Sequence, residues 1–259
     1  MIAPLLQQGT AAPSIGQHLR SILFALAFYA STAAYVVVGS PLLLAPRRWA
    51  MAGARSHARV SLWLLRMIVG TKIEVRGREN LPLGAFLVAA KHQSAWDTFA
   101  LLPIFRDPAL VMKAELRWIP FYGWFSVKFG HILIQRGRAA AALKAMIRDA
   151  RQRAAQGREI LIFPEGTRSV PGSAPDYKPG VVALYEGLEL PCVPVALNSG
   201  LYWPRRRLIR YPGTIVVEIL EPLPAGLSRT TFKRELQQRI EHASSRLIAE
   251  AGARDGSVL

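Results

Sequence analysis

His92 and Asp97 are the two side chains of this sequence whose types and spacing could pass a proton to and from a bound molecule. A carboxylate that accepts a hydrogen bond from one imidazole nitrogen leaves the other nitrogen free to act as a base. On one α-helix, residues at this spacing would lie roughly 140° apart and would not meet. The chemistry therefore requires a bend between them. Taken alone, the spacing also fits a loop histidine followed by a helix-capping aspartate.

Apolar runs on both sides supply the elements that the bend requires. Residues 85–90 form an apolar run of strand length, and residues 99–102 begin a stretch with helical spacing. His92 would then leave a strand, and Asp97 would enter a helix. A helix N-terminus nearby would favour the neutral imidazole, which is the form that takes up a proton.

Short apolar strands alternate with helical segments from residue 71 onward. We expect strands at residues 72–75, 85–90, 110–113, 132–135, 160–163, 193–197 and 214–220. We expect helices at residues 97–105, 138–156, 180–187 and 231–251. This alternation predicts an α/β fold with a mostly parallel or mixed sheet covered by helices.

The N-terminal part differs in character. Residues 21–46 carry no charged side chain and exceed the length of about 20 apolar residues that a membrane span needs. The break at Gly39-Ser40-Pro41 leaves open a helix that dips into the membrane and turns back. Residues 47–69 predict a helix on which four arginines lie within roughly 40° of one another. These arginines are Arg48, Arg55, Arg59 and Arg66.

We interpret the basic helix as interfacial, with guanidinium groups among lipid phosphates, although the solvated face of an ordinary helix has the same pattern. The sequence thus predicts an N-terminal hydrophobic and amphipathic helical membrane anchor in residues 1–70, followed by an α/β domain in residues 71–259. If residues 21–45 span the bilayer, the arginines after them place the domain on the cytoplasmic side.

The composition limits the partners. Lys and Arg number 33 against 17 Asp and Glu, so the formal net charge is +16, which indicates a polyanionic partner. At 51% hydrophobic residues, with aromatics in apolar runs, the chain fits an anionic membrane better than nucleic acid. The single cysteine, Cys192, excludes a disulfide within the chain and a zinc site built on several cysteines.

Residues 116–125 hold five aromatic side chains, although aromatics make up only 9% of the chain. Core packing explains such a cluster equally well as an acyl-chain groove or a membrane-facing surface, where Trp and Tyr are enriched. The sequence leaves these alternatives open.

Three further blocks follow downstream. The second, residues 130–137, predicts a strand that carries Arg136 out at its end, where its planar fork could bind phosphate oxygens. The third, Phe-Pro-Glu-Gly-Thr-Arg-Ser at residues 163–169, is the most specific; a salt bridge between Glu165 and Arg168 is its purely structural explanation. The fourth, residues 193–200, is an apolar strand in which Pro194 predicts an edge or first-residue position.

In this order, the four blocks resemble the glycerolipid acyltransferase family, most closely the bacterial 1-acylglycerol-3-phosphate acyltransferases, over roughly residues 70–225. The resemblance implies that His92 is the general base and that Asp97 orients it. It implies substrate binding by the positions of the other three blocks: Arg136, Glu165, Gly166, Thr167, Arg168 and Pro194. The sequence departs from the family pattern at Lys91, where asparagine is common, and at Gln135, where an acidic residue is common.

The resemblance further implies a reaction. An acyl chain would pass from an acyl thioester, either acyl carrier protein or coenzyme A, to the sn-2 hydroxyl of lysophosphatidic acid. Direct attack needs no cofactor, metal or enzyme nucleophile, and the sequence has no Gly-x-Ser-x-Gly elbow. The implied location is the bacterial inner membrane, with the catalytic domain on the cytoplasmic side. Two alternatives stay open: another lyso-lipid acceptor, such as a lyso-amino-acid lipid, and a non-catalytic basic membrane-binding protein of the same fold.

Overall fold

A computed structural model describes residues 13–135 and 139–255. Within them, seven strands form one sheet in the order β1-β7-β6-β2-β5-β3-β4. The strands are β1 (Thr71–Arg76), β2 (Leu87–Ala90), β3 (Ala109–Lys113), β4 (Ile132–Ile134), β5 (Ile160–Ile162), β6 (Cys192–Leu197) and β7 (Gly213–Ile219). The strands β2 to β6 are mutually parallel, whereas β7 pairs antiparallel with β6 and parallel with β1. The mixed sheet is confirmed, and every strand lies within two residues of its expected position.

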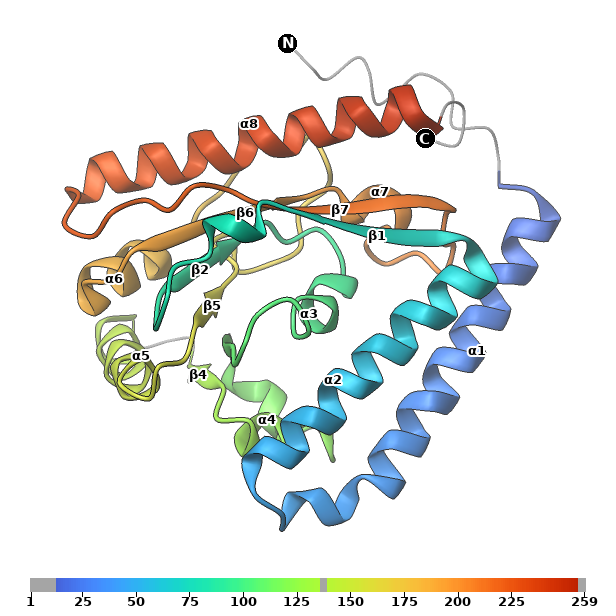
Figure 1. Ribbon diagram of the computed structural model, residues 1–259, viewed down its shortest axis with the longest axis horizontal. Helices are drawn as coiled ribbons and strands as arrows, with labels where there is room; N and C mark the ends of the chain where they lie inside the picture. The colour runs from blue at the N-terminus through green and yellow to red at the C-terminus, as the bar shows by residue number, and fades with distance from the viewer. Residues whose placement is uncertain (1–12, 136–138, 256–259) are drawn as a thin grey trace.

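Helices cover both faces of the sheet (Figure 1). The long helices are α1 (Ile15–Val38), α2 (Arg47–Leu64), α5 (Ala139–Ala154), α6 (Pro179–Leu188) and α8 (Arg229–Asp255); the short ones are α3 (Trp96–Ala100), α4 (Tyr122–Lys128) and α7 (Ser199–Tyr202). Shorter helical turns are η1 (Ser40–Leu43), η2 (Leu65–Val69), η3 (Arg78–Asn80) and η4 (Ala114–Trp118). Side chains of α1, α3 and α7 pack on one face, and those of α5, α6 and α8 pack on the other.

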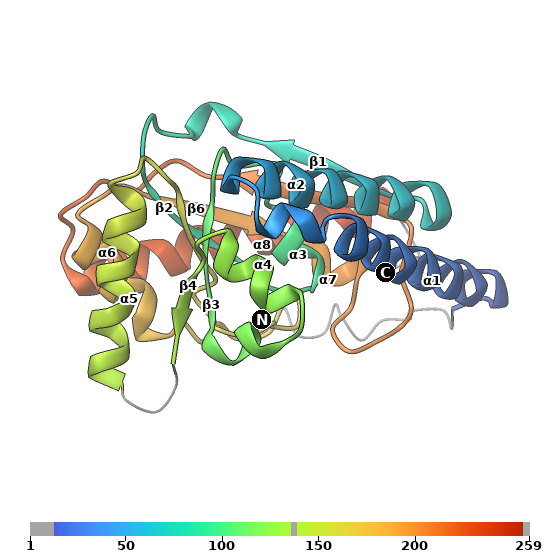
Figure 2. The same cartoon turned by 90° about the horizontal axis from the view of Figure 1, so that it is seen from below.

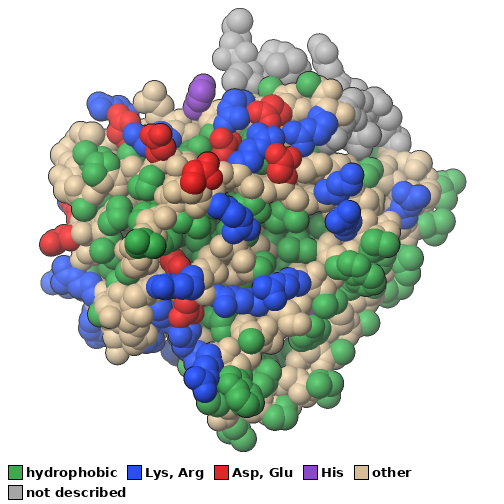
Figure 3. All heavy atoms as spheres, in the orientation of Figure 1, with side chains coloured by type: hydrophobic (Ala, Val, Ile, Leu, Met, Phe, Trp, Pro, Cys, Tyr) green, Lys and Arg blue, Asp and Glu red, His purple; other side chains and the backbone are tan. Residues whose placement is uncertain are grey.

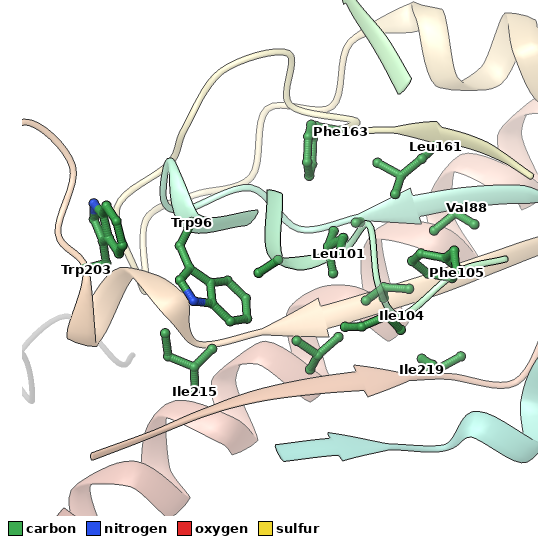
Figure 4. Close-up of a cluster of buried hydrophobic side chains, with 14 of the residues drawn as sticks. Val88, Trp96, Leu101, Ile104, Phe105, Leu161, Phe163, Trp203, Ile215 and Ile219 are labelled. Atoms are coloured by element: carbon green, nitrogen blue, oxygen red, sulfur yellow. The ribbon is translucent and has the colours of Figure 1, made fainter. Parts of the chain in front are cut away.

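Alternation along the central strand β2 divides the core in two. Val88 and Ala90 face the cluster on the α3 side, whereas Leu87 and Ala89 face the cluster beneath α6 and α8. Figure 4 shows the first cluster, in which Trp96 of α3 and Phe163 after β5 lie over the sheet. Since alternation continues past the end of β2, Lys91 turns toward α8 and the next residue turns toward α3.

The N-terminal helices lie against the domain. The helices α1 and α2 run side by side, joined by η1, as Figure 2 shows. The α1 residue Phe24 and the η2 residues Leu65 and Val69 are buried in the cluster on the α3 side. The helix α1 is long and apolar enough to cross a membrane by length and composition. It ends at Val38, and the Gly39-Ser40-Pro41 break forms the turn back toward α2.

The helix expected at residues 97–105 is shorter than predicted, because α3 ends at Ala100. Proline at position 103 has no N–H to donate to the preceding turn and disfavours helical backbone before it. Residues 101–105 therefore continue in turns, with Leu102 N bonded to Phe99 O at 3.2 Å.

The expected edge or first-residue position of Pro194 is wrong, since Pro194 is the third residue of β6 and β6 lies between β7 and β2 in the middle of the sheet. A β-bulge explains how a residue without an N–H fits there. Cys192 pairs with Leu223 and Val195 pairs with Ile219, so two residues of β6 face three residues of the partner segment. Pro194 lies in this irregular stretch, where its carbonyl still accepts from Leu220 N at 3.0 Å.

Candidate active site

The carboxyl ends of five parallel strands meet at one edge of the sheet. Lys91 and His92 follow β2, residues 163–168 follow β5, Ser199 follows β6, and Lys113 ends β3. Ligand sites in open α/β sheets lie at this edge, because side chains from several strands converge there. Arg136, which follows β4 in sequence, lies outside the described residues.

His92 and Asp97 meet across the predicted bend. The strand β2 ends at Ala90 and α3 begins at Trp96, so the chain turns between the two residues. The His92 Nδ1 lies 2.9 Å from Asp97 Oδ2. The His92 side chain is 12% exposed, and no described residue forms a hydrogen bond with its Nε2. With the ring proton on Nδ1, the Nε2 lone pair is free to accept a proton.

The Asp97 carboxylate is fully buried and accepts three further hydrogen bonds. The backbone amides of Gln93 and Ser94 donate to its Oδ2 at 2.8 and 2.9 Å. The hydroxyl of Ser199 donates to Oδ1 at 2.6 Å. Since every neighbour donates and none accepts, this shell fits the ionised carboxylate, which is an acceptor only.

Contacts from the third block hold the histidine in place. Its ring stacks on that of Phe163, with centroids 4.1 Å apart and an interplanar angle of 18°. The backbone N–H and the hydroxyl of Ser169 both donate to the His92 carbonyl, at 2.8 and 3.1 Å. The carboxylate of Glu165 accepts from His92 N at 3.3 Å. Phe163, Ser169 and Glu165 thus hold the ring and backbone of His92 in addition to Asp97.

Lys91 anchors the same loop from the α8 side. Its side chain is 2% exposed, and its ammonium lies 2.8 Å from Glu241 Oε1 and 3.5 Å from Glu165 Oε2. The hydroxyl of Tyr177 also donates to Glu241, at 2.9 Å. Burial and the neighbouring carboxylate Glu241 raise the pKa of the Tyr177 phenol, which keeps this donor protonated. Lys91 thus balances the buried carboxylate of Glu165 and the partly buried carboxylate of Glu241.

The structure does not form the Glu165–Arg168 salt bridge that would give the third block a purely structural role. The buried Glu165 faces Lys91, and among the described residues the guanidinium of Arg168 has no ion pair or hydrogen bond. The carbonyl of Arg168 accepts from Arg205 at 2.7 Å, which fixes the backbone there. Gly166 adopts the left-handed region with φ 63°, and Thr167 is exposed. The Glu165–Arg168 salt bridge is therefore not formed, and the planar fork of Arg168 is unpaired in the described part of the chain.

Two other reactive groups lie away from this chemistry. Burial lowers the pKa of His131 to about 3, and its Nδ1 accepts from Leu110 N at 3.1 Å, so it is a structural acceptor. Burial raises the pKa of the Cys192 thiol, which lies within β6 under α8. Among the described residues, no group of three or more His, Cys, Asp or Glu side chains is placed to hold a metal ion.

Three residues with a place in this site were not identified from the sequence. Ser199 sits two residues after the predicted strand of the fourth block, and nothing local shows that it reaches Asp97. Glu241 lies on a helix far along the chain from its partner Lys91. Lys113 had a usable signal, because a cation that ends a parallel strand emerges at the same edge as the residues after β2 and β5.

Comparison with known proteins gives the family. The Acyltransferase family model matches residues 72–198. A 1-acyl-sn-glycerol-3-phosphate acyltransferase of Pseudomonas aeruginosa is 35% identical over 237 residues, covering 90% of this chain and 92% of that protein. The chain belongs to the acyltransferase family. It is an enzyme of the acyltransferase class, as the four blocks indicate.

A second relative and a solved structure are also similar to this chain. The protein of the same name from Saccharomyces cerevisiae is 30% identical over 211 residues, covering 80% of this chain and 69% of that protein. The crystal structure of the 1-acyl-sn-glycerophosphate (LPA) acyltransferase PlsC from Thermotoga maritima has a TM-score of 0.76 and 24% identity. The match covers 90% of this chain and 98% of the Thermotoga chain, so the two proteins share the fold.

Replacing Lys91 by Met should destabilise the acyltransferase. The change leaves Glu165 buried beside an uncompensated carboxylate of Glu241, and breaking one side of a buried ion pair costs about 3 kcal/mol or more. For a chain of this size, that lowers the melting temperature by roughly 6–12 °C. Thermal unfolding in detergent measures it, with the exposed Lys72→Met as the matched control. Equal melting temperatures for both variants would show that the network contributes no stability.

Removing the Ser199 hydroxyl should lower kcat. A hydrogen bond to a charged group contributes about 1.5–3 kcal/mol, so Ser199→Ala is expected to reduce kcat about 10–100-fold, with KM little changed. Ser244, a buried serine of α8 whose hydroxyl has no hydrogen-bond partner in the described part of the chain, provides the control Ser244→Ala. Steady-state kinetics on folded protein compare the two. Unchanged kcat in Ser199→Ala would contradict a role for this hydroxyl in positioning Asp97.

Proposed function

We propose that the enzyme transfers an acyl chain from an acyl thioester to the sn-2 hydroxyl of 1-acylglycerol-3-phosphate, which gives phosphatidic acid. The observation that carries the proposal is the His92–Asp97 pair at the edge where the parallel strands end, with Nε2 of the histidine bonded to none of the described residues. The names of the Pseudomonas and yeast relatives support the lysophosphatidic acid acceptor. The thioester is carried by acyl carrier protein or by coenzyme A.

In this mechanism, the acceptor hydroxyl attacks the thioester carbonyl while Nε2 of His92 removes its proton. Asp97 stabilises the imidazolium that forms and keeps the ring oriented. The tetrahedral intermediate then expels the thiolate, the carbon–sulfur bond breaks, and the imidazolium returns the proton to sulfur. The buried Cys192 has no part in the reaction, and no acyl-enzyme intermediate is required.

The acceptor phosphate requires cations at a fixed distance from His92. Arg168 is half-buried after β5 and its guanidinium is unpaired among the described residues, while Lys113 is exposed at the end of β3. We assign the phosphate to Arg168, with Lys113 as a further cation at the same edge. Arg136, which follows β4 in sequence, remains the additional phosphate ligand that the resemblance implies. Glu165 contributes indirectly, because its carboxylate is occupied by His92 N and Lys91.

The enzyme works at an anionic membrane, which we propose is the cytoplasmic face of the bacterial inner membrane. In Figure 3, hydrophobic side chains gather along the α1 edge and at the lower corner, where α1 turns into α2. The inner face of α1 packs on the domain, since the ring of Phe24 lies 5.3 Å from that of Trp203. A helix held along the domain in this way lies in one leaflet with its outer face in lipid. A helix in this position does not cross the bilayer, so the whole domain stays on one side of the membrane.

One assay tests the proposed reaction. Purified protein in detergent, with radiolabelled lysophosphatidic acid and an acyl thioester, is expected to form phosphatidic acid. His92→Ala should lower the rate by about 10²–10⁴-fold, because that is the usual contribution of a general base. Asp97→Asn should also impair catalysis, since an amide stabilises the imidazolium less well. A rate near wild type for His92→Ala would exclude the mechanism. Transfer only to another lyso-lipid would show that this lipid, and not lysophosphatidic acid, is the acceptor.

Arg168→Lys separates acceptor binding from loop support. Lysine keeps the charge but loses the two-pronged geometry, so KM for lysophosphatidic acid should rise much more than KM for the thioester, with kcat comparatively spared. The exposed Arg234→Lys on α8 is the control. Kinetics with each substrate varied in turn decide the point. Equal shifts in both KM values would rule out Arg168 as the phosphate ligand.

The basic face of α2, which continues into η2 with Arg66, gives a prediction about vesicle binding. Arg48, Arg59 and Arg66 are exposed, whereas Arg55 donates to the carbonyl of Phe105 at 3.2 Å and holds α2 on the domain. Replacing the three exposed arginines by Gln should weaken binding to anionic vesicles by about 3 kcal/mol, or roughly 100-fold, and added salt should act similarly. The control is a variant in which Gln replaces three other exposed arginines, Arg148, Arg229 and Arg234. Binding that survives both treatments would mean that α1 anchors the protein alone.

A further inference from the structure

The segment between β3 and β4 displays an unusual surface. Six large apolar side chains within ten residues are between 37% and 74% exposed: Trp118, Ile119, Phe121, Tyr122, Trp124 and Val127, which we call the α4 patch. The sequence left core packing, an acyl groove and a membrane-facing surface open for this region. Exposure of this extent argues against core packing.

The helix α4 is amphipathic in the reverse sense of a helix on a soluble domain. Its buried residues are the small Gly123 and Ser126, whereas Tyr122, Trp124 and Val127 point outward. A soluble helix buries its large apolar side chains and exposes polar ones. The reversal shows that the outer face of α4 is suited to an apolar medium.

The backbone of this segment supports the outward direction of these side chains. A Cβ on Gly123 would lie 1.8 Å from the Arg117 carbonyl oxygen, so only glycine fits the close approach of the two turns. Phe121 adopts φ 60°, a conformation that non-glycine residues rarely take. Gly123 N and Phe125 N each bond a carbonyl four residues back, at 2.8 Å. The patch is thus a folded surface with fixed side-chain directions.

The α4 patch adjoins the apolar tip of the N-terminal helices. The helix α4 packs beside α2 and η1, and Figures 1 and 2 show all three at the same end of the molecule. Exposed large side chains at that tip include Val37, Val38, Leu44 and Trp49. The two apolar surfaces therefore lie next to each other at one end of the molecule, with Lys113, Arg117 and Lys128 in the sequence around the patch.

We propose that the α4 patch is a second membrane-inserting element, which enters the same leaflet of an anionic bilayer as the α1–α2 tip. Trp and Tyr side chains favour the membrane interface, and the guanidinium of Arg117 lies 4.5 Å over the Trp118 ring in the arrangement that pairs an aromatic with a headgroup-level cation. The neighbouring apolar tip formed by α2 and η1 and the excess of basic residues favour lipid over a second copy of the chain or another protein.

The second contact has a consequence for the active site, which rests on the proposed function. The segment that carries the patch starts where β3 ends, at the edge that holds His92. Contacts at both the α1–α2 tip and α4 fix the tilt of the domain, because two separate contacts restrict rotation that one contact allows. The strand edge is then held against the leaflet from which a lyso-lipid arrives.

Tryptophan fluorescence tests the insertion. The difference in emission between wild type and Trp118→Phe/Trp124→Phe isolates the signal of the patch from the other four tryptophans. On adding anionic vesicles, this difference emission should shift to shorter wavelength, and lipids brominated on the acyl chain should quench it. Unshifted, unquenched difference emission from protein that sediments with the vesicles would overturn the proposal. A blue shift that depends on protein concentration and appears without lipid would overturn it in favour of a second copy.

Binding of the protein to vesicles gives a second measure of the insertion of the α4 patch. Trp118→Ser/Trp124→Ser should weaken vesicle binding at least about tenfold, because two large side chains then no longer leave water. Leu83→Ser, which removes a fully exposed leucine before β2, is the control and should change little. Equal binding by both variants would contradict the proposal. His92→Ala should show wild-type quenching, so failure of the acyl-transfer assay and failure of the insertion are distinguishable.

Discussion

The buried carboxylate of Asp97 is the group on which the rest of the site depends. An unpaired charge in the interior is very costly, so this carboxylate requires donors from all sides. It receives them from the histidine ring, from two successive backbone amides and from Ser199. These donors come from the loop after β2 and from the turn after β6, which are neighbours in the sheet. Satisfying one charge therefore fixes the geometry of two strand ends.

The same loop is held from the opposite face of the sheet. Alternation sends Lys91 toward α8 and His92 toward α3, so adjacent residues join separate polar groups. Lys91 balances Glu241 and Glu165, and Glu165 in turn receives the backbone N–H of His92. The ionic network thus supports the position of the histidine without touching its ring. A catalytic base fixed in this way needs little reorganisation when it takes up a proton.

The sequence predicted the sheet well, because apolar strands and turn residues are local signals. It also predicted that His92 leaves a strand and that Asp97 enters a helix. It could not predict the donor from Ser199 or the partner of Lys91, since both contacts join residues more than 100 positions apart. Pro194 was misplaced for a related reason, because the bulge that accommodates it depends on the register of β7. The role of Gly123 could not be predicted either. This glycine allows α4 to approach the backbone of Arg117, and hydrophobic periodicity carries no signal for such a contact.

We propose that Asp97 holds His92 in the tautomer that leaves Nε2 unprotonated. Nitrogen-15 NMR of the histidine-labelled protein in detergent tests it most directly, with His92→Ala used to assign the signal. At roughly pH 8.5, where an imidazole is ordinarily neutral, the His92 resonances should show a protonated Nδ1 and a bare Nε2. In Asp97→Asn, this preference should be lost or weakened. A wild-type signal with the proton on Nε2 would contradict the claim, because that nitrogen could not then remove the proton of an acceptor hydroxyl.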